Sequence, residues 1–197
     1  MKVYLVSGNT HKLLEIQKIA PEGVEIESIT SLDVSLNIDE NGDTFIQNSI
    51  KKVEAFRNLG VPLIADDSGL EIDALDGFPG VHSARFMEEH SYEEKMQAIL
   101  EKLANVENRT ARFRCAATFF DPKNFILLAA EGTVEGTIAL EIRGNKGFGY
   151  DPIFIPEGYK KTFGELGEEI KNRISHRSRA FKRLFELLHL YILHERI

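Results

Sequence analysis

The sequence is poor in cysteine and tryptophan, and its basic residues are outnumbered by its acidic ones. Its 197 residues include one cysteine, Cys115, and no tryptophan. A single cysteine excludes an intramolecular disulfide and any metal site built from several cysteines. Lysine and arginine total 24 against 31 aspartate and glutamate residues, which gives a net charge of −7 at pH 7. Because nonspecific binding to nucleic acid requires clustered cations that neutralise phosphates, this balance argues against a nucleic-acid partner.

Long apolar runs are also missing. After Met1 and Lys2, the first apolar run covers only residues 3–6, far short of a signal peptide or a membrane span. We therefore expect a cytoplasmic protein with no membrane partner. Apolar residues nevertheless make up 43% of the chain, which is enough to bury a substantial core.

The apolar periodicity predicts an α/β chain, with βα units first and a β-rich middle. No linker separates its parts, so we expect one domain over residues 1–197. The predicted strands cover residues 3–6, 24–29, 61–65, 112–121, 125–131, 133–143 and 153–155. The predicted helices cover residues 13–20, 44–56 and 181–193, with a further helix opened by a capping box at Ser91 and Glu94. The helix over residues 44–56 also opens with the form of a capping box, at Thr44 and Gln47, and its predicted apolar stripe is Ile46, Ile50, Val53 and Phe56.

A polar segment joins the first strand to the first helix. A glycine lets the backbone approach a ligand closely, and free N–H groups at a helix start favour an anion. A hydroxyl and a lysine add a donor and a full positive charge. The segment is not a P-loop, so an ordinary strand-to-helix turn is the alternative interpretation. Its residues are Ser7, Gly8, Asn9, Thr10, His11 and Lys12.

Two adjacent carboxylates, Asp66 and Asp67, follow an apolar strand and precede Ser68 and Gly69. Two neighbouring carboxylates are costly unless a cation offsets their charge, and Mg²⁺ typically takes one or two of them. An acidic turn is the alternative. Since consecutive strand residues point to opposite sides, we expect one aspartate to face a site, and we favour Asp67 with Asp66 in a supporting role.

A second acidic stretch, residues 39–43, precedes the helix that carries Asn48 and Lys52. Taken alone, it is typical of a solvated loop. Lys52, however, could bring a cation to the same pocket, which makes Glu40 of interest.

Two later segments carry groups suited to a nucleobase. Residues 144–151 are glycine-rich, but their spacing is wrong for a dinucleotide fingerprint and no helix-forming stretch follows. Glycines around Phe148 and Tyr150 instead favour an aromatic side chain held against a flat base. Lys171 and the run Ser175, His176 and Arg177 form a cluster of donors that could read the carbonyl oxygens of a base, although Ser175 could simply be a helix N-cap and Arg177 a surface residue.

Taken together and in this order, these segments resemble the inosine triphosphate pyrophosphatase family. The matching blocks span nearly the whole chain. They are residues 7–12, 42–45 with Asn48, 65–69, 78–80 with 83–85, 147–152 and 175–177. The resemblance implies an elongated α/β fold with a mixed sheet flanked by helices, two lobes with a central cleft, and a homodimer. It also implies Mg²⁺-dependent hydrolysis of ITP, dITP and XTP to the nucleoside monophosphate and pyrophosphate.

The resemblance also implies a role for each candidate residue. Asp67 and Lys52 would serve catalysis, and Asp67 and Glu40 would hold the metal. Residues 7–12 and Ser68 would contact the phosphates. The base would lie against Phe148, Gly149, Tyr150, Asp151, Lys171, His176 and Arg177.

Two alternatives remain open from the sequence. One is a related nucleotide pyrophosphatase acting on other modified bases, and the other is a nucleotide-sensing module without catalysis. A haloacid-dehalogenase-like phosphatase is disfavoured, because its paired aspartates should follow the first strand.

Overall fold

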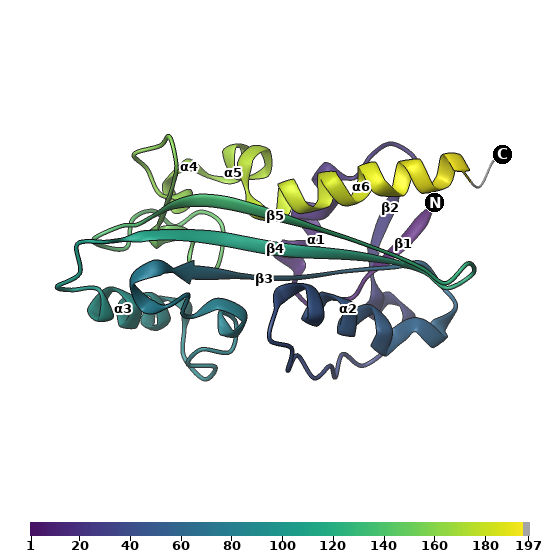
Figure 1. The fold of residues 1–197 in the computed structure, drawn as a ribbon, viewed down its shortest axis with the longest axis horizontal. Helices are drawn as coiled ribbons and strands as arrows, with labels where there is room; N and C mark the ends of the chain where they lie inside the picture. Colours follow the sequence, from purple (N-terminus) through teal and green to yellow (C-terminus); the bar gives the residue numbers. More distant parts are fainter. Residues whose placement is uncertain (195–197) are drawn as a thin grey trace. The chain divides into compact units, whose positions relative to one another are not determined.

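The computed structural model describes residues 1–194. Over this range the strands form one sheet with the order β2-β1-β3-β4-β5-β6 (Figure 1). β1 pairs in parallel with β2 and β3, and β5 pairs antiparallel with β6. The predicted mixed α/β fold with flanking helices is therefore confirmed. The strands are β1 (Lys2–Leu5), β2 (Glu25–Ser28), β3 (Leu63–Ile72), β4 (Thr110–Asp121), β5 (Ile126–Ile138) and β6 (Phe154–Pro156).

Each of the first three helices of the structure corresponds to a predicted helix, whereas the C-terminal part of the chain contains more helices than predicted. α4 and α5 were not predicted, and α6 begins five residues earlier than expected. The helices are α1 (Thr10–Ile19), α2 (Phe45–Phe56), α3 (Tyr92–Lys102), α4 (Phe163–Leu166), α5 (Glu168–Ile174) and α6 (His176–His194). Among residues 1–194, no helix combines the length and the apolar character needed to cross a membrane.

The chain divides into two compact units. Unit 1 comprises Met1–Asp67, Cys115–Gly132 and the C-terminal segment from His176 onward, and unit 2 comprises Ser68–Arg114 and Thr133–Ser175. β3, β4 and β5 each contribute residues to both units. The prediction of a single domain stays a prediction.

Unit 1 has a core on each face of its strands. Val3 and Leu5 of β1 pack with Phe181 of α6, whereas Val6 packs on the other side with Val53 of α2. In Figure 1, α6 and α2 accordingly lie on opposite faces of the sheet. The alternation of strand side chains thus places one helix layer on each face.

Unit 2 has its own apolar core, built from β3, β4, β5 and α3. The predicted capping box at the start of α3 is confirmed. Ser91 Oγ accepts from the Glu94 N–H at 3.3 Å, and Glu94 Oε2 accepts from the Ser91 N–H at 2.8 Å. The buried residues of the unit 2 core include Leu70, Ile72, Met96, Ile99, Phe113, Phe154 and Phe163.

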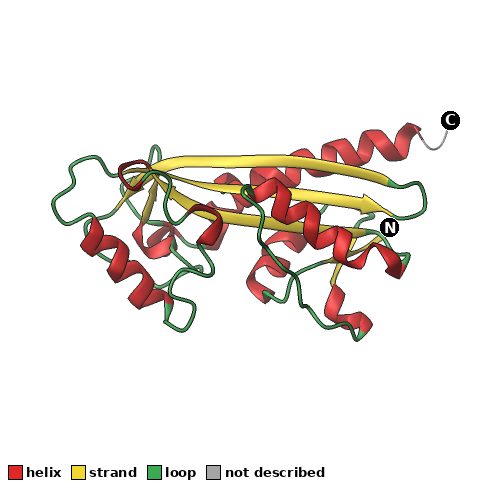
Figure 2. Cartoon of the chain, turned by 60° about the horizontal axis from the view of Figure 1, so that its bottom comes forward, coloured by secondary structure: helices red, strands yellow, loops and turns green. Residues whose placement is uncertain are grey.

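β5 corrects the prediction of two separate strands over residues 125–131 and 133–143. It runs without a break from Ile126 to Ile138, and residues 139–143 lie outside it (Figure 2). Gly132, which separates the two predicted strands, is a point of close contact with α6. A Cβ at this position would lie 2.3 Å from the His176 carbonyl oxygen and 2.4 Å from the Ala180 nitrogen. The glycine therefore serves helix packing within the strand.

The start and the buried face of α2 also differ from prediction. Thr44 caps the helix by accepting from the Gln47 N–H at 3.3 Å, but the Gln47 side chain accepts from the Asp43 N–H instead of completing a capping box. The predicted apolar stripe included Ile46 and Ile50, which are only half-buried. The buried residues of α2 are Phe45, Asn48, Ser49, Lys52 and Val53, and three of them are polar.

Candidate functional site

β3 extends through Asp66 and Asp67 instead of ending there, which corrects the predicted strand boundary. Both aspartates are buried, with 1% and 6% of their surface exposed. Their side chains meet different helices, as expected for consecutive strand residues. Asp67 contacts α2, and Asp66 contacts α1 and α6. Cationic and amide partners on both faces allow a charged pair to lie inside a strand.

On the α2 face, Asp67 is held by two side chains. Its Oδ1 lies 3.3 Å from Lys52 Nζ, and its Oδ2 accepts from Asn48 Nδ2 at 3.0 Å. The same Lys52 ammonium lies 2.9 Å from Glu40 Oε2. Burial lowers the pKa of Lys52, but the carboxylates of Asp67 and Glu40 outweigh burial and raise it. Lys52 therefore stays charged between two carboxylates.

On the opposite face, Asp66 pairs with two cations from distant parts of the chain. Its Oδ2 lies 3.0 Å from Lys12 Nζ and 3.2 Å from Arg177 Nη2. Burial alone would raise the pKa of Asp66, yet Lys12 and Arg177 hold it well below its usual range. Arg177 also donates to Glu15 at 2.5 Å. Burial lowers the pKa of Arg177, but Asp66 and Glu15 reverse this effect and raise it.

The start of α1 is capped by its own chain. Asn9 Oδ1 accepts from the backbone N–H groups of His11 and Lys12 at 2.9 and 3.3 Å, and the Asn9 N–H donates to Ser7 Oγ. The prediction of free N–H groups at this helix start is wrong for these two groups, because the Asn9 side chain occupies them. Attraction for an anion in this segment therefore depends mainly on the charge of Lys12, which is half-buried.

In unit 2, a buried ion pair lies under an aromatic ring. Lys171 Nζ lies 2.6 Å from Asp151 Oδ2 and 4.1 Å from the centre of the Phe148 ring. Asp151 Oδ2 also accepts from the Phe148 N–H at 2.8 Å. A Cβ at Gly147 would lie 2.1 Å from that oxygen, and the backbone there has φ +75°, so only glycine fits. These contacts fix the ring and its cation as one cluster.

Tyr150 anchors this cluster to the segment around Ser83. The Tyr150 hydroxyl donates to the Ser83 carbonyl at 2.8 Å, and Ser83 Oγ accepts from the Leu70 N–H at 2.9 Å. Burial raises the pKa of Tyr150, with a smaller contribution from Tyr92, whose ring packs edge-on at 5.4 Å. Gly149 lies beside the Tyr92 ring.

The structure thus brings the predicted residues together in separate clusters. Unit 1 holds Lys12, Glu40, Lys52, Asp67 and Arg177, and unit 2 holds Phe148, Gly149, Tyr150, Asp151 and Lys171. Ser68 is half-buried, His11 is exposed and His176 is buried. Arg177 contacts Asp66 and Glu15 within unit 1, and its predicted role in base recognition stays a prediction.

Asn48, Glu15 and Ser83 have no role predicted from the sequence, although each contacts a predicted residue. For Asn48 a signal was available, because it lies four residues before Lys52 and so shares a helix face with it. For Glu15, the spacing of three residues from Lys12 gives a similar signal. Nothing in the local sequence around Ser83 points to Tyr150.

A magnesium ion can be tested against the donors that are present. Within residues 1–194, no three His, Cys, Asp or Glu side chains gather closely enough to hold a metal by themselves. Mg²⁺ needs fewer, since it usually takes one or two carboxylates and fills its other positions with water and phosphate. Asp67 and Glu40 supply two carboxylates that approach one ammonium, that of Lys52. This donor set fits Mg²⁺.

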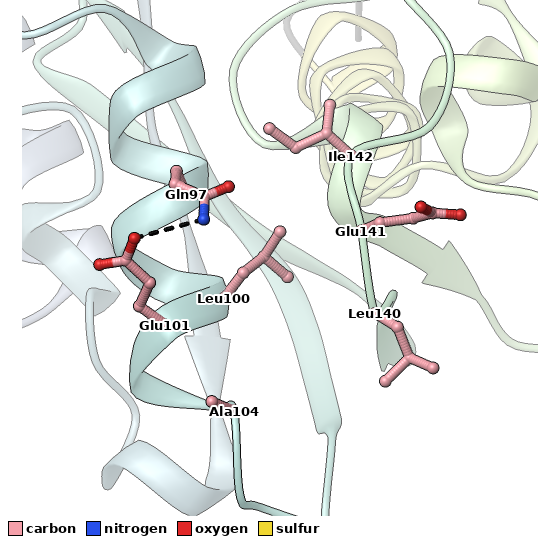
Figure 3. Close-up of a pocket in the computed structure, with 7 residues that line it drawn as sticks. All are labelled: Gln97, Leu100, Glu101, Ala104, Leu140, Glu141 and Ile142. Carbon is pink, nitrogen blue, oxygen red and sulfur yellow. Dashed lines mark hydrogen bonds between the residues drawn. The ribbon is translucent and has the colours of Figure 1, made fainter.

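A pocket of about 350 Å³ lies in unit 2, and its lining includes neither Asp67 nor Glu40 (Figure 3). It is lined by Gln97, Leu100, Glu101 and Ala104 of α3 and by residues 140–142. Gln97 and Glu101 are hydrogen-bonded to each other at 3.3 Å. The pocket contains none of the residues predicted for catalysis or substrate binding, so we do not place the reaction there.

Comparison with known proteins shows which family this chain resembles. The Ham1 family model matches residues 3–187. A dITP/XTP pyrophosphatase from Desulforamulus reducens is 41% identical over 203 residues and covers 100% of both chains. One from Porphyromonas gingivalis is 43% identical over 192 residues, with 95% of this chain and 97% of that protein covered. The solved structure of a HAM1 protein from Coxiella burnetii is 38% identical, with a TM-score of 0.87 over 96% of this chain and 98% of that one.

Proposed function

The chain belongs to the Ham1 family, and we propose that it hydrolyses non-standard purine nucleoside triphosphates to the nucleoside monophosphate and pyrophosphate. The substrates are ITP, dITP and XTP. The proposal is supported by the two relatives named dITP/XTP pyrophosphatase, which match nearly the whole chain. It is also supported by the resemblance seen in the sequence, whose matching blocks include both acidic and basic candidate residues.

The observation that carries the chemistry is the contact of Asp67 and Glu40 with Lys52. Hydrolysis requires water to approach a polyanion, so the site must supply positive charge and a base. Asp67 accepts a proton from the attacking water, and Lys12 binds phosphate oxygens. Lys52, whose ammonium contacts Asp67, Glu40 and the Asp66 carbonyl, supplies positive charge at the two carboxylates. Lys12 donates one N–H to Asp66. Because an ammonium has three N–H groups, it can also donate to a phosphate.

Magnesium is the proposed cofactor, with Asp67 and Glu40 as the residues that would hold it. When bound, it would neutralise charge on the phosphate oxygens. Residues 7–12 and Ser68 contribute further phosphate contacts.

The unit 2 cluster is the proposed base site. Phe148 stacks on the purine, and Lys171 beneath its ring fixes the ring in place. Inosine and xanthine carry a carbonyl at position 6, where adenine carries an amino donor. Because Lys171 covers one face of the Phe148 ring, His176 and Arg177 remain as the proposed donors that pair with a carbonyl and face a like group in adenine. Because a mismatch leaves buried polar groups unpaired, such a site can discriminate by about 10⁴-fold.

The test is pyrophosphate release across ITP, XTP, GTP, ATP and dUTP with Mg²⁺. We expect rapid release from ITP and XTP and slow release from ATP and dUTP. Comparable rates on ATP and ITP would refute the proposed selectivity, and nucleotide binding without release would identify a sensing module. A homodimer and a cytoplasmic location also stay predictions, which light scattering and cell fractionation would check.

A further inference from the structure

Asn48 on α2 is fully buried, and both ends of its side-chain amide are hydrogen-bonded. Its Nδ2 donates to Asp67 Oδ2 at 3.0 Å, and its Oδ1 accepts from the Gly42 N–H at 2.7 Å. A backbone N–H can only donate, so the amide oxygen must face Gly42 and the amide nitrogen must face Asp67. The two partners therefore fix the orientation of the amide.

The contact with Gly42 requires the absence of a side chain at that position. A Cβ on Gly42 would lie 2.7 Å from Asn48 Oδ1 and 2.9 Å from Gln47 Cβ. The next backbone N–H, that of Asp43, donates to Gln47 Oε1 at 2.8 Å. Two successive side chains of α2 thus hold two successive N–H groups of the loop that carries Glu40.

We propose that Asn48 is a positioning residue, which orients the Asp67 carboxylate and ties it to the loop that carries Glu40. The inference rests on the proposed function, because it concerns the work of Asp67 and Glu40. These two carboxylates are connected by two routes. One passes through Lys52, at 3.3 and 2.9 Å, and the other passes through Asn48 and the Gly42 backbone.

A neutral amide suits this position. It satisfies one oxygen of a buried carboxylate without adding a positive charge, and a second fixed cation would compete with a metal for Asp67. An aspartate at position 48 would still accept from the Gly42 N–H, but it would place a carboxylate against Asp67. Asn48→Asp therefore breaks one contact and keeps the other.

Three variants separate a positioning role from a structural one. Asn48→Asp breaks the contact with Asp67, and Gly42→Ala displaces the loop but keeps the amide. Ser49→Ala is the matched control. Ser49 is the next residue of α2, it is fully buried, and its Oγ bonds to the Ala65 carbonyl and to Thr118 at 3.2 and 2.8 Å. Its loss removes buried hydrogen bonds without touching Asp67.

Steady-state pyrophosphate release from dITP measures kcat and KM, and calorimetric titration measures Mg²⁺ binding to the nucleotide-free protein. Partners that orient metal ligands are worth about 10- to 100-fold in affinity or activity. We therefore expect Asn48→Asp to lower kcat by that factor, with KM changed less than about threefold. Gly42→Ala should weaken Mg²⁺ binding by about tenfold. Ser49→Ala should lower the melting temperature and leave kcat and Mg²⁺ binding close to those of the wild type.

Wild-type kcat and Mg²⁺ binding in Asn48→Asp and Gly42→Ala, with only the melting temperature lowered, would overturn the inference. If Asn48→Asp does not fold, Gly42→Ala decides, and unchanged Mg²⁺ binding in it overturns the inference alone. A wild-type protein that releases no pyrophosphate from dITP or XTP would instead overturn the proposed function. In that case the Mg²⁺ titrations would still test the positioning role of Asn48.

Discussion

The buried pair of Lys171 and Asp151 gives a prediction whose size follows from the structure. The two side chains are 3% and 2% exposed, and 2.6 Å separates Nζ from Oδ2. Lys171→Met keeps most of the aliphatic stem but removes the ammonium, which leaves the Asp151 carboxylate buried without its cation. Breaking one partner of a buried pair costs about 3–5 kcal/mol. The lost contact with the Phe148 ring adds about 1 kcal/mol, and the Phe148 N–H bond to Asp151 offsets part of the total.

The assay is urea unfolding followed by circular dichroism, arranged as a double-mutant cycle. Lys171→Met should lower the free energy of unfolding by about 3–5 kcal/mol. Combining it with Asp151→Asn removes both charges, so the double variant should lose at least about 2 kcal/mol less than the sum of the single losses. Because Asp151 holds the Phe148 backbone, Lys171→Met should also raise KM for dITP.

Lys95→Met is the matched control. Lys95 is equally buried, with 4% exposed, but within the described residues its ammonium contacts the Ala84 carbonyl at 2.8 Å and the Tyr92 ring. Its removal leaves no buried carboxylate, so the expected loss is only about 1–2 kcal/mol, from one hydrogen bond and one contact with a ring. Equal losses in Lys171→Met and Lys95→Met, or additive effects in the cycle, would refute the argument from an uncompensated charge.

Three further predictions concern single side chains. Asp67→Asn should keep the fold and lower kcat about 10³-fold in the pyrophosphate assay, and an active variant would remove Asp67 from the mechanism. Gly132→Ala should lose about 3 kcal/mol in urea unfolding because its Cβ meets backbone atoms of α6, whereas Gly60→Ala, with φ +69° and open space, should lose about 1 kcal/mol. Burial raises the pKa of Tyr150, and a tyrosine in the unfolded chain ionises near pH 10, so the unfolded state binds fewer protons above that pH. The free energy of unfolding should therefore fall as pH rises above about 10, and Tyr150→Phe should reduce this fall; parallel pH profiles would contradict it.

Local rules predicted the elements whose signals are local. The capping box at Ser91 and Glu94 depends on residues three apart, and the structure contains it. The alternation of side chains in a strand predicted that Asp66 and Asp67 point apart, which their different partners confirm. Both features are set by backbone geometry alone.

Local rules failed where a residue's partner lies far along the chain. Gly132 has the local character of a turn residue, but its role is set by the approach of α6 more than 40 residues later. The Asp-Asp-Ser-Gly sequence likewise has the character of a turn. It lies in a strand because Lys12 and Arg177 neutralise Asp66 from either end of the sequence.

The charges around the two aspartates also support proposing a metal on one face of β3 and not on the other. Strand alternation separates Asp66 from Asp67, but it does not tell how charge is distributed between the faces. On the α1 and α6 side, the carboxylates of Asp66 and Glu15 meet two cations, those of Lys12 and Arg177. On the α2 side, the carboxylates of Asp67 and Glu40 meet one, that of Lys52. Among these side chains the surplus negative charge lies with Asp67, where a divalent cation lowers the energy most. That surplus arises from tertiary packing, and it supports the proposal that the metal binds at Asp67.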